Sequence, residues 1–216
     1  MNGTHYPQFC ALARSAEILG ERWTLLIIRE LLIGPKRFGD LVDGLASVSP
    51  TVLTSRLNAL TESGVVRRVT TPAPFNVQVY ELTDIGLALK PAIFELIRWG
   101  GYFLFPVRPD DQFDPDWVIL ALEAIVRSSP SPAVLIHLRV AHKSDAVDIL
   151  VRGGEAGTRL SKGDGPADAT IETGFDSLLR MTANKLTLDK AVSEGLVRVK
   201  GSRKAARNLP RLFDLR

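Results

Sequence analysis

The sequence predicts an α+β fold in two domains. In the first half, apolar residues recur at helical spacing and then give way to two short β-rich runs. The second half alternates helical and extended patterns, which is typical of a sheet covered by helices. Between the halves, residues 106–115 hold three prolines, and these exclude a continuous helix. We therefore expect domains at residues 1–105 and 116–216, joined by a linker at 106–115.

The composition is that of a globular protein, since 45% of the residues are hydrophobic and 24% are charged. Cys10 is the single cysteine, which excludes a disulfide within the chain and fits a reducing compartment. No signal peptide and no apolar stretch of about 20 residues is visible, so we expect a cytoplasmic protein without membrane association. The net charge of +3 permits nucleic-acid binding without requiring it, so any such function must rest on local clusters of charge.

The first half is expected to fold as helices, a hairpin and a final helix. The expected helices lie at residues 11–19, 21–32, 37–45, 49–62 and 84–102, and the last is kinked at Pro91. Ser49 suits an N-cap, Pro50 suits the first helical position, and Gly64 ends that helix. Residues 65–71 and 77–82 predict two strands joined by a tip at 72–76. This order is that of a helix-turn-helix with a two-stranded wing.

The helix at 49–62 has the two faces that reading of a DNA major groove requires. At about 100° per residue, Leu53, Leu57 and Leu60 fall on one face. The opposite face and its flanks carry polar or charged side chains: Thr51, Thr54, Ser55, Arg56, Asn58 and Glu62. Short hydroxyl and amide groups allow close approach to base edges, where asparagine pairs with adenine and threonine methyls contact thymine. The alternative is an ordinary solvated face, and Glu62 would repel phosphate.

Basic residues gather around this helix and are candidates for phosphate contacts. Arg67 and Arg68 alternate along a strand, so only one of them is expected to meet DNA directly. The wing tip at Phe75 and Asn76 is expected along the minor groove. The candidate DNA-binding residues are Lys36, Arg37, Ser49, Thr51, Thr54, Ser55, Arg56, Asn58, Arg67, Arg68 and Asn76. Each basic residue taken singly also fits a role in solubility, and their placement around one helix favours DNA.

Several segments in fixed order carry a family resemblance: residues 10–31 (CALARSAEILGERWTLLIIREL), 34–38 (GPKRF), 49–60 (SPTVLTSRLNAL), 64–68 (GVVRR) and 80–83 (YELT), with Gly86. Over about residues 8–103 the chain resembles the HxlR-type winged helix-turn-helix regulators. The resemblance implies a homodimer paired through helices 11–19 and 84–102. Its two recognition helices would enter successive major grooves of a near-palindromic operator. The sequence departs from the family at residues 20–23 (GERW), where members often have two glycines and a lysine before the tryptophan.

Cys10 lies at the expected start of the helix at 11–19. The exposed N–H groups of a helix start favour the thiolate, and Arg14 would add positive charge. Some members of the resembled family use a cysteine at this position to sense electrophiles or oxidants, which makes Cys10 a candidate redox residue. The alternative is a small apolar side chain packed in the dimer interface.

The second half is expected to hold helices at 116–127, 175–184, 188–194 and 203–213, and strands at 133–140, 146–151, 158–160, 169–172 and 196–199. It offers no catalytic constellation. Of the histidines, His137 and His142 would face opposite sides of one strand, and no third metal ligand stands at matching spacing. Residues 153–157 (GGEAG) predict a hairpin turn because they lack the Lys-Ser/Thr of a phosphate loop. We expect no enzyme, no metal and no cofactor.

A second resemblance rests on residues 169–173 (ATIET), 175–181 (FDSLLRM), 185–201 (KLTLDKAVSEGLVRVKG) and 209–213 (LPRLF). They resemble the C-terminal part of sterol carrier protein-like domains, which have an apolar tunnel between a small sheet and its helices. Ala183 and Asn184 stand where such domains usually have a glycine. The resemblance implies an apolar ligand site, with these candidate lining residues: Leu179, Met181, Leu186, Leu196 and Phe213. The alternative is that they are ordinary core.

Two functions remain open at this point. The first is a DNA-binding transcriptional regulator that reads a near-palindromic operator as a homodimer and carries a domain for a small apolar effector. The second is a carrier of lipids or other apolar ligands whose first half only dimerises. The basic residues around 49–58 favour the first.

Overall fold

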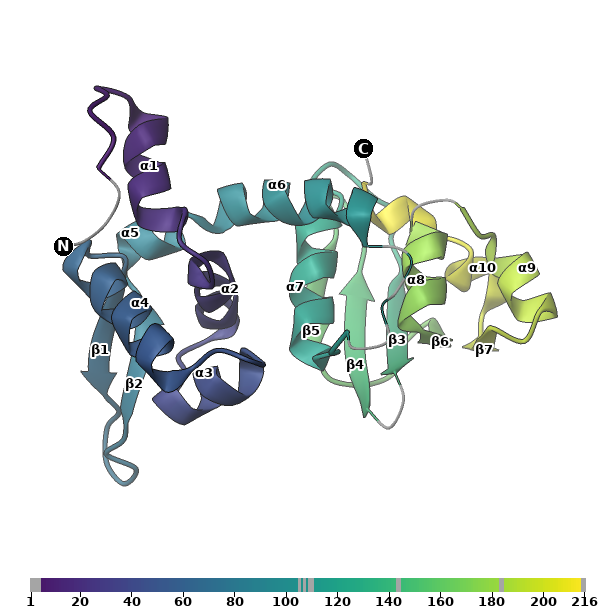
Figure 1. Cartoon of the computed structure of the whole chain (residues 1–216). Coiled ribbons are helices and arrows are strands. Elements are labelled where there is room, and N and C mark those ends of the chain that lie inside the picture. The colour runs from purple at the N-terminus through teal and green to yellow at the C-terminus, as the bar shows by residue number, and fades with distance from the viewer. Residues whose placement is uncertain are drawn as a thin grey trace. The chain divides into compact units, whose positions relative to one another are not determined.

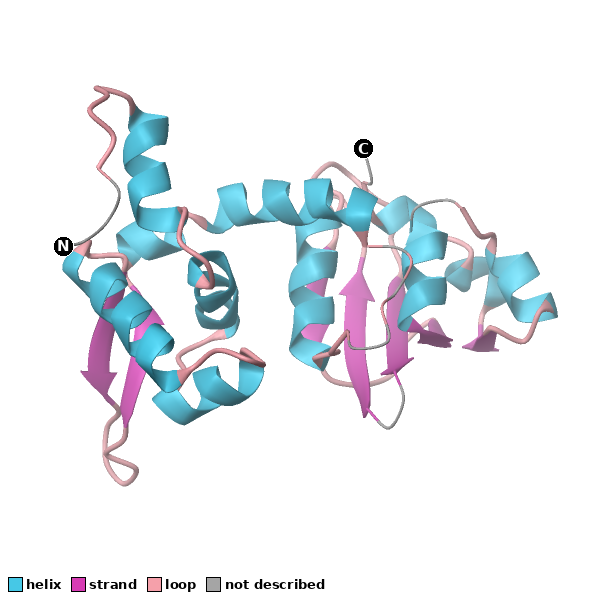
Figure 2. Ribbon diagram, viewed as in Figure 1, coloured by secondary structure: helices cyan, strands magenta, loops and turns pink. Residues whose placement is uncertain are grey.

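A computed structural model describes residues 5–104, 106, 108, 111–142, 145–182 and 185–214. The chain divides into two compact units, Met1–Ile93 and Phe94–Arg216. Figure 1 labels their helices and strands, and Figure 2 distinguishes the two kinds of element. The following residues lie outside the described part: 107, 109 and 110 of the expected linker, residues 105, 143 and 144, both chain ends (1–4, 215–216) and the Ala183-Asn184 departure.

The four helices expected ahead of the hairpin are confirmed: α1 (Ala11–Leu19), α2 (Thr24–Ile33), α3 (Phe38–Gly44) and α4 (Pro50–Glu62). The expected start of the second helix at residue 21 is wrong. Trp23 precedes α2 with φ 78°, in the left-handed region, and this conformation breaks the helical path between Gly20 and Thr24. Residues 21–23 therefore form a turn between α1 and α2 rather than a first helical turn.

The single helix expected at 84–102 is also wrong. The chain forms α5 (Asp84–Leu87), then α6 (Lys90–Gly100), then a short 3-10 helix, η1 (Gly101–Phe103). Pro91 causes this interruption, although the helix breaks before it, between Leu87 and Lys90. A proline ring clashes with the carbonyl four residues earlier, which here belongs to Leu87. The helix ends there and restarts with Pro91 in its first turn, where an amide hydrogen would have no helical partner.

The wing is a two-stranded antiparallel sheet of β1 (Val66–Thr70) and β2 (Gln78–Leu82), in which Arg67 lies opposite Glu81. Gly64, at φ 72°, turns the chain out of α4 into β1. The main chain of Lys36 also pairs with that of Tyr80, through N–H···O=C bonds of 3.0 and 2.8 Å. These two bonds join the turn between α2 and α3 to the wing.

The second unit contains a five-stranded sheet in the order β5-β4-β3-β6-β7, in which β3 and β6 are parallel and the other neighbours antiparallel. Its strands are β3 (Leu135–His142), β4 (Asp145–Arg152), β5 (Arg159–Lys162), β6 (Ala169–Gly174) and β7 (Val197–Gly201). Its helices are α7 (Pro115–Ile125), α8 (Phe175–Thr182), α9 (Leu188–Ser193), α10 (Arg203–Ala206) and the 3-10 helix η2 (Leu209–Leu212). The turn expected at 153–157 is confirmed, because it connects the antiparallel strands β4 and β5.

The continuous helix expected at 203–213 is wrong for the same reason as the earlier one. Pro210 stands four residues after Ala206, and α10 ends at Ala206. In both places a proline four residues past the last helical residue ends an otherwise favourable helical pattern.

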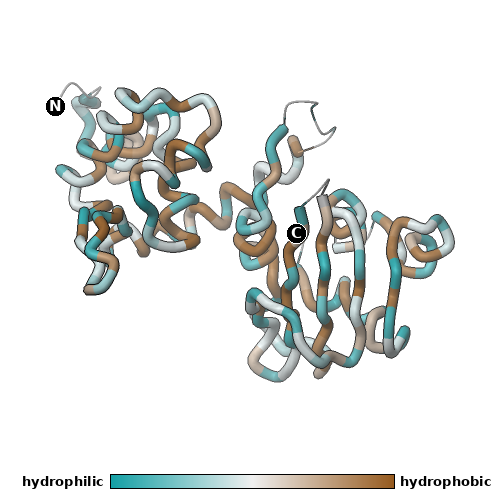
Figure 3. The backbone as a smooth tube through the Cα atoms, turned by 90° about the horizontal axis from the view of Figure 1, so that it is seen from below, coloured by the Kyte–Doolittle hydropathy of each residue, from teal (hydrophilic) through white to brown (hydrophobic). Residues whose placement is uncertain are grey.

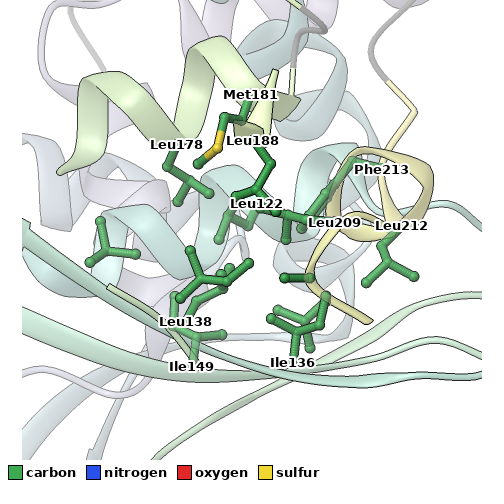
Figure 4. Packing of buried hydrophobic residues seen from close by; sticks show 14 of the residues in the cluster. Leu122, Ile136, Leu138, Ile149, Leu178, Met181, Leu188, Leu209, Leu212 and Phe213 are labelled. Carbon is green, nitrogen blue, oxygen red and sulfur yellow. The ribbon is translucent and has the colours of Figure 1, made fainter. Parts of the chain in front are cut away.

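The helices of this unit cover one face of the sheet. Hydrophobic and hydrophilic residues alternate along its strands (Figure 3), and the inward residues Ile136, Leu138 and Ile149 are fully buried. In Figure 4 these side chains point to the side where Leu122, Leu178 and the chain end around Leu212 and Phe213 lie. The described outward residues of the same strands are half-buried or exposed, so the sheet has one buried and one open face.

In the first unit, the burial of Leu53 on α4 predicts a large effect on stability. Leu53 is completely buried, so Leu53→Ala is expected to lower the free energy of unfolding by about 2–5 kcal/mol. Urea unfolding followed by circular dichroism measures this loss. Asn58→Ala on the exposed side of the same helix is the control and is expected to change stability by less than about 0.5 kcal/mol. Equal losses in both variants would contradict the orientation of α4.

Candidate nucleic-acid interface

The two faces of α4 are as the sequence predicts. Leu53, Leu57 and Leu60 are at most 2% exposed, and α4 packs against β1. The other side is one open surface made of Pro50, Thr51, Thr54, Ser55, Asn58, Ala59 and Glu62. α4 follows α3 after a short turn, which gives the helix-turn-helix arrangement. The Ser49 hydroxyl accepts a hydrogen bond from the Val52 N–H at 3.3 Å, which confirms Ser49 as the N-cap.

The polar side chains of this surface differ in how they are held. The Thr54 hydroxyl donates to the Pro50 carbonyl at 2.8 Å, so its proton is used within the helix. Among the described residues, the side chains of Thr51, Ser55 and Asn58 have no hydrogen-bond partner in the chain. Their donors and acceptors are therefore available to an external partner.

Arg56 is held by an acidic residue that the sequence does not reveal as its partner. Its guanidinium donates to the Glu21 carboxylate at 2.7 Å, and the Arg56 side chain is only 25% exposed. The Arg56 Nε is buried without a hydrogen-bond partner. Glu21 lies in the turn between α1 and α2, 35 residues away in sequence, so no local pattern predicts the contact. The ion pair connects this turn to α4.

The wing arginines are exposed on opposite faces of β1, as the strand alternation predicts, and both have partners. Arg67 forms an ion pair of 2.6 Å with Glu81 directly across the hairpin. Arg68 donates to Gln78 and lies over the Tyr80 ring, 5.9 Å from its centroid. The register of the hairpin could have predicted Glu81 as the partner of Arg67, since residues opposite each other share a face.

The remaining candidates flank α4 differently. Lys36 is half-buried and its main chain is bound to Tyr80, whereas Arg37 is exposed at the N-cap of α3, where its N–H donates to Asp40 at 2.9 Å. At the wing tip, Asn76 is exposed with φ 46° and Phe75 is exposed beside it. None of these side chains is buried in the core, so all remain accessible to a large partner.

Cys10 is exposed at the N-cap of α1. Arg14, expected to add positive charge near the thiol, donates instead to the Glu17 carboxylate at 3.0 Å. The backbone N–H of Tyr6 holds the pKa of Glu17 below its usual value, and Arg14 adds to this effect. The charge of Arg14 is therefore directed to Glu17.

The candidate lining residues of the second unit divide between core and surface. Met181, Leu186 and Phe213 belong to the buried cluster that Figure 4 shows in part. Leu179 is half-buried and Leu196 is 40% exposed. Of the histidines, His137 bonds to Asp148 at 2.8 Å, and no group of three metal-ligating side chains occurs in the described part of the chain. None of the described helices is long and apolar enough to cross a bilayer.

Two family models match the chain, one in each half. The HxlR-like helix-turn-helix model matches residues 18–107, and the SCP-2 sterol transfer family model matches residues 132–214. Together they confirm the expected fold class, a winged helix-turn-helix followed by an α+β sterol carrier-like domain.

Named relatives match the first half. The HTH-type transcriptional regulator YodB of Bacillus subtilis is 35% identical over 98 residues, which cover 45% of this chain and 88% of YodB. YvaP of the same organism is 37% identical over 94 residues, 43% of this chain and 86% of YvaP. An HTH-type transcriptional regulator of Mycobacterium bovis is 43% identical over 94 residues, 44% of this chain, and the chain spans 59% of that relative's length.

Solved structures match the same half. The reduced form of YodB from B. subtilis is 33% identical, covers 47% of this chain and 100% of its own, and gives a TM-score of 0.40. The putative transcription factor PA1607 is 33% identical, covers 51% of this chain and 75% of its own, and gives a TM-score of 0.44.

A double-mutant cycle tests the bond between Glu21 and Arg56. Glu21→Ala and Arg56→Ala are expected to be coupled by about 0.5–1 kcal/mol in the free energy of unfolding, because the pair is partly shielded from water. Urea unfolding of the two single variants and the double variant measures this coupling. The helical pair Lys190–Glu194, at 3.8 Å and well exposed, is the control and is expected to show less than about 0.5 kcal/mol. A coupling no larger than that of the control would mean that the pair does not hold the turn to α4.

Proposed function

Because the chain belongs to the HxlR-like helix-turn-helix family of transcriptional regulators, we propose that its first domain binds duplex DNA as a homodimer and reads bases with α4. The DNA-binding and dimerisation domain is assigned to residues 1–105, a linker to 106–115 and an effector-binding domain to 116–216. The observation that carries the proposal is the open side of α4, where Thr51, Ser55 and Asn58 have no partner among the described residues.

The chemistry of this surface fits a major groove. The groove is about 12 Å wide and admits an α-helix with short outward side chains. The Asn58 amide can bond to adenine through both its donor and its acceptor. Thr54 has its hydroxyl proton turned to the backbone, which leaves its methyl group for thymine. Glu62 repels phosphate, so the N-terminal part of α4 enters the groove and Glu62 stays at its edge.

Phosphate contacts surround the reading surface. Arg37 at the start of α3 and one of the wing arginines flank it, and Asn76 extends the wing tip towards the minor groove. Arg56 and Arg67 reach phosphate by exchanging a carboxylate for it, since Glu21 and Glu81 hold them in the free protein. Such an exchange replaces one charge-assisted bond by another, so its net free energy is small.

Exposed apolar side chains on α1 and on α6–η1 support a homodimer. α1 buries only Ala13, and Leu12 is 76% exposed. Trp99, 62% exposed, packs edge-on against Phe103 at 4.9 Å, and Leu96 and Tyr102 are exposed on the same segment. An isolated helix of nine residues is marginal in water, and a second copy packed on α1 would stabilise it. A two-fold dimer places its recognition helices about 34 Å apart and predicts a near-palindromic operator.

The second domain is proposed to bind a small apolar effector, which the SCP-2 match supports. Ligand binding there requires the core around Met181, Leu186 and Phe213 to open, with Leu179 and Leu196 nearer the surface. An effector regulates DNA binding only if it binds the two functional states with different affinity. Cys10 remains a proposed redox residue, exposed at the start of the dimerisation helix.

Binding to the protein's own upstream DNA tests the reading surface. Asn58→Ala is expected to weaken specific binding by about 5- to 150-fold, the effect of losing one bidentate base contact. Arg67→Ala is expected to lower the slope of log K against log salt by about 0.9, the effect of one phosphate contact. Fluorescence anisotropy with a labelled duplex at several NaCl concentrations measures both changes.

Arg211→Ala, which removes an exposed arginine of the second domain, is the matched control and is expected to bind as the wild type does. If the wild type shows no preference for this DNA over random duplex but binds apolar ligands tightly, the protein is a carrier and not a regulator. If Asn58→Ala and Arg67→Ala both match the control, the reading surface lies elsewhere.

Charge substitutions on the exposed apolar residues test the homodimer. Leu12→Glu and Trp99→Glu place a carboxylate where apolar contact is expected, and each is expected to weaken dimerisation by at least tenfold. Sedimentation velocity over a range of concentrations measures the dissociation constant. Phe75→Glu at the wing tip, an equally exposed apolar site, is the control and is expected to leave the dimer intact. A wild type that is monomeric at all concentrations would overturn the dimer.

A further inference from the structure

The open face of the five-stranded sheet in the second unit is strongly basic. Its outward charged residues come from all five strands, and alternation and register place them on one side: Arg139, Asp148, Arg152, Arg159, Glu172, Arg198 and Lys200. Five of them are cations and two are carboxylates. The excess of three positive charges equals the formal net charge of the entire chain, so the charges of all other residues sum to zero.

The carboxylates in the middle of this face are already neutralised. Asp148 contacts His137 at 2.8 Å and Arg139 at 3.5 Å. Glu172 contacts Lys200 at 2.6 Å and Arg198 at 3.9 Å, and the Lys200 hydrogen bond lowers the pKa of Glu172. Each of the two carboxylates therefore already has basic partners on the same face.

Arg152 and Arg159 form the unusual part of the face. They are direct cross-strand partners on β4 and β5, and both are exposed. Within the described residues neither has an acidic partner. Like charges directly opposite each other, with Cβ atoms about 5 Å apart, destabilise a sheet. A sequence that keeps such a local conflict indicates a function for the pair.

We propose that the open face of this sheet, with Arg152 and Arg159 at its β4–β5 edge, is a second contact surface for the phosphate backbone of duplex DNA. The proposal rests on the proposed function and extends it, because the contact is independent of sequence and is made by a domain otherwise assigned to an effector. It would add to the affinity set by α4 without adding base recognition.

The distribution of charge favours a polyanion over a small anion. Cations lie at both edges of the sheet, on β5 and on β7, which are four strand spacings or about 19 Å apart. A single phosphate or carboxylate could occupy the Arg152–Arg159 pair but not reach β7. Duplex DNA carries one charge per about 1.7 Å of its axis and spans the whole face. No Phe, Tyr or Trp lies among the described outward residues of these strands, and His137 is held by Asp148, so the face lacks the aromatic platform on which single strands stack.

Arg159→Glu in the full-length protein separates this function from folding. It replaces a like-charge pair by an opposite-charge pair across the same two strands, so the melting temperature is expected to rise by up to about 3 °C. Binding to a random-sequence 40-base-pair duplex at 0.1 M NaCl is expected to weaken by about tenfold, with a smaller salt slope. Arg203→Glu is the control: it makes the same change in net charge on α10, which lies on the covered side of the sheet.

Each outcome decides the proposal. A loss of affinity in Arg159→Glu that greatly exceeds the loss in Arg203→Glu supports it. Equal affinities, or equal losses, overturn it while leaving the role of α4 untouched. Binding of wild type to anionic phospholipid vesicles, lost in Arg159→Glu without a change in DNA affinity, overturns it in favour of a membrane contact. A wild type that binds no duplex at all refutes the proposed function itself, and the inference with it.

Discussion

The three leucines on the inner side of α4 are the constraint on which the first unit depends. Leu53, Leu57 and Leu60 are completely or almost completely buried, and they fix the rotation of the helix about its own axis. Because the leucines fix this rotation, the hydroxyl and amide groups of the helix face the opposite side, and no further contact is needed to orient them. The same burial that stabilises the fold therefore positions the proposed reading surface, and the two properties cannot vary independently.

Periodicity in the sequence predicts this surface well because helical spacing is a local property. The faces of α4, its N-cap at Ser49 and the wing strands follow from residues a few positions apart. The interruptions ahead of Pro91 and Pro210 were predictable in principle, since within a helix the proline ring clashes with the carbonyl four residues earlier. The left-handed Trp23 was not, because nothing in its neighbours requires that conformation.

Long-range pairing explains the rest of what sequence patterns miss. Glu21 meets Arg56 only because α1, α2 and α4 pack as they do, and the sequence separation of 35 residues hides the contact. Likewise, the cross-strand arginines on β4 and β5 become neighbours only when the register is known. The apolar residues of the second unit show a different limit of sequence patterns. The pattern predicts that Met181 and Phe213 are buried, but it does not distinguish a packed core from a ligand site.

The main-chain pairing of Lys36 with Tyr80 has a consequence for how this domain diversifies. Both hydrogen bonds join backbone atoms, so they survive replacement of either side chain by any residue other than proline. The hairpin thus stays joined to the turn between α2 and α3 whatever residues it carries at its tip. Over evolutionary time, the tip can acquire a new preference for a groove while the geometry of the domain stays the same.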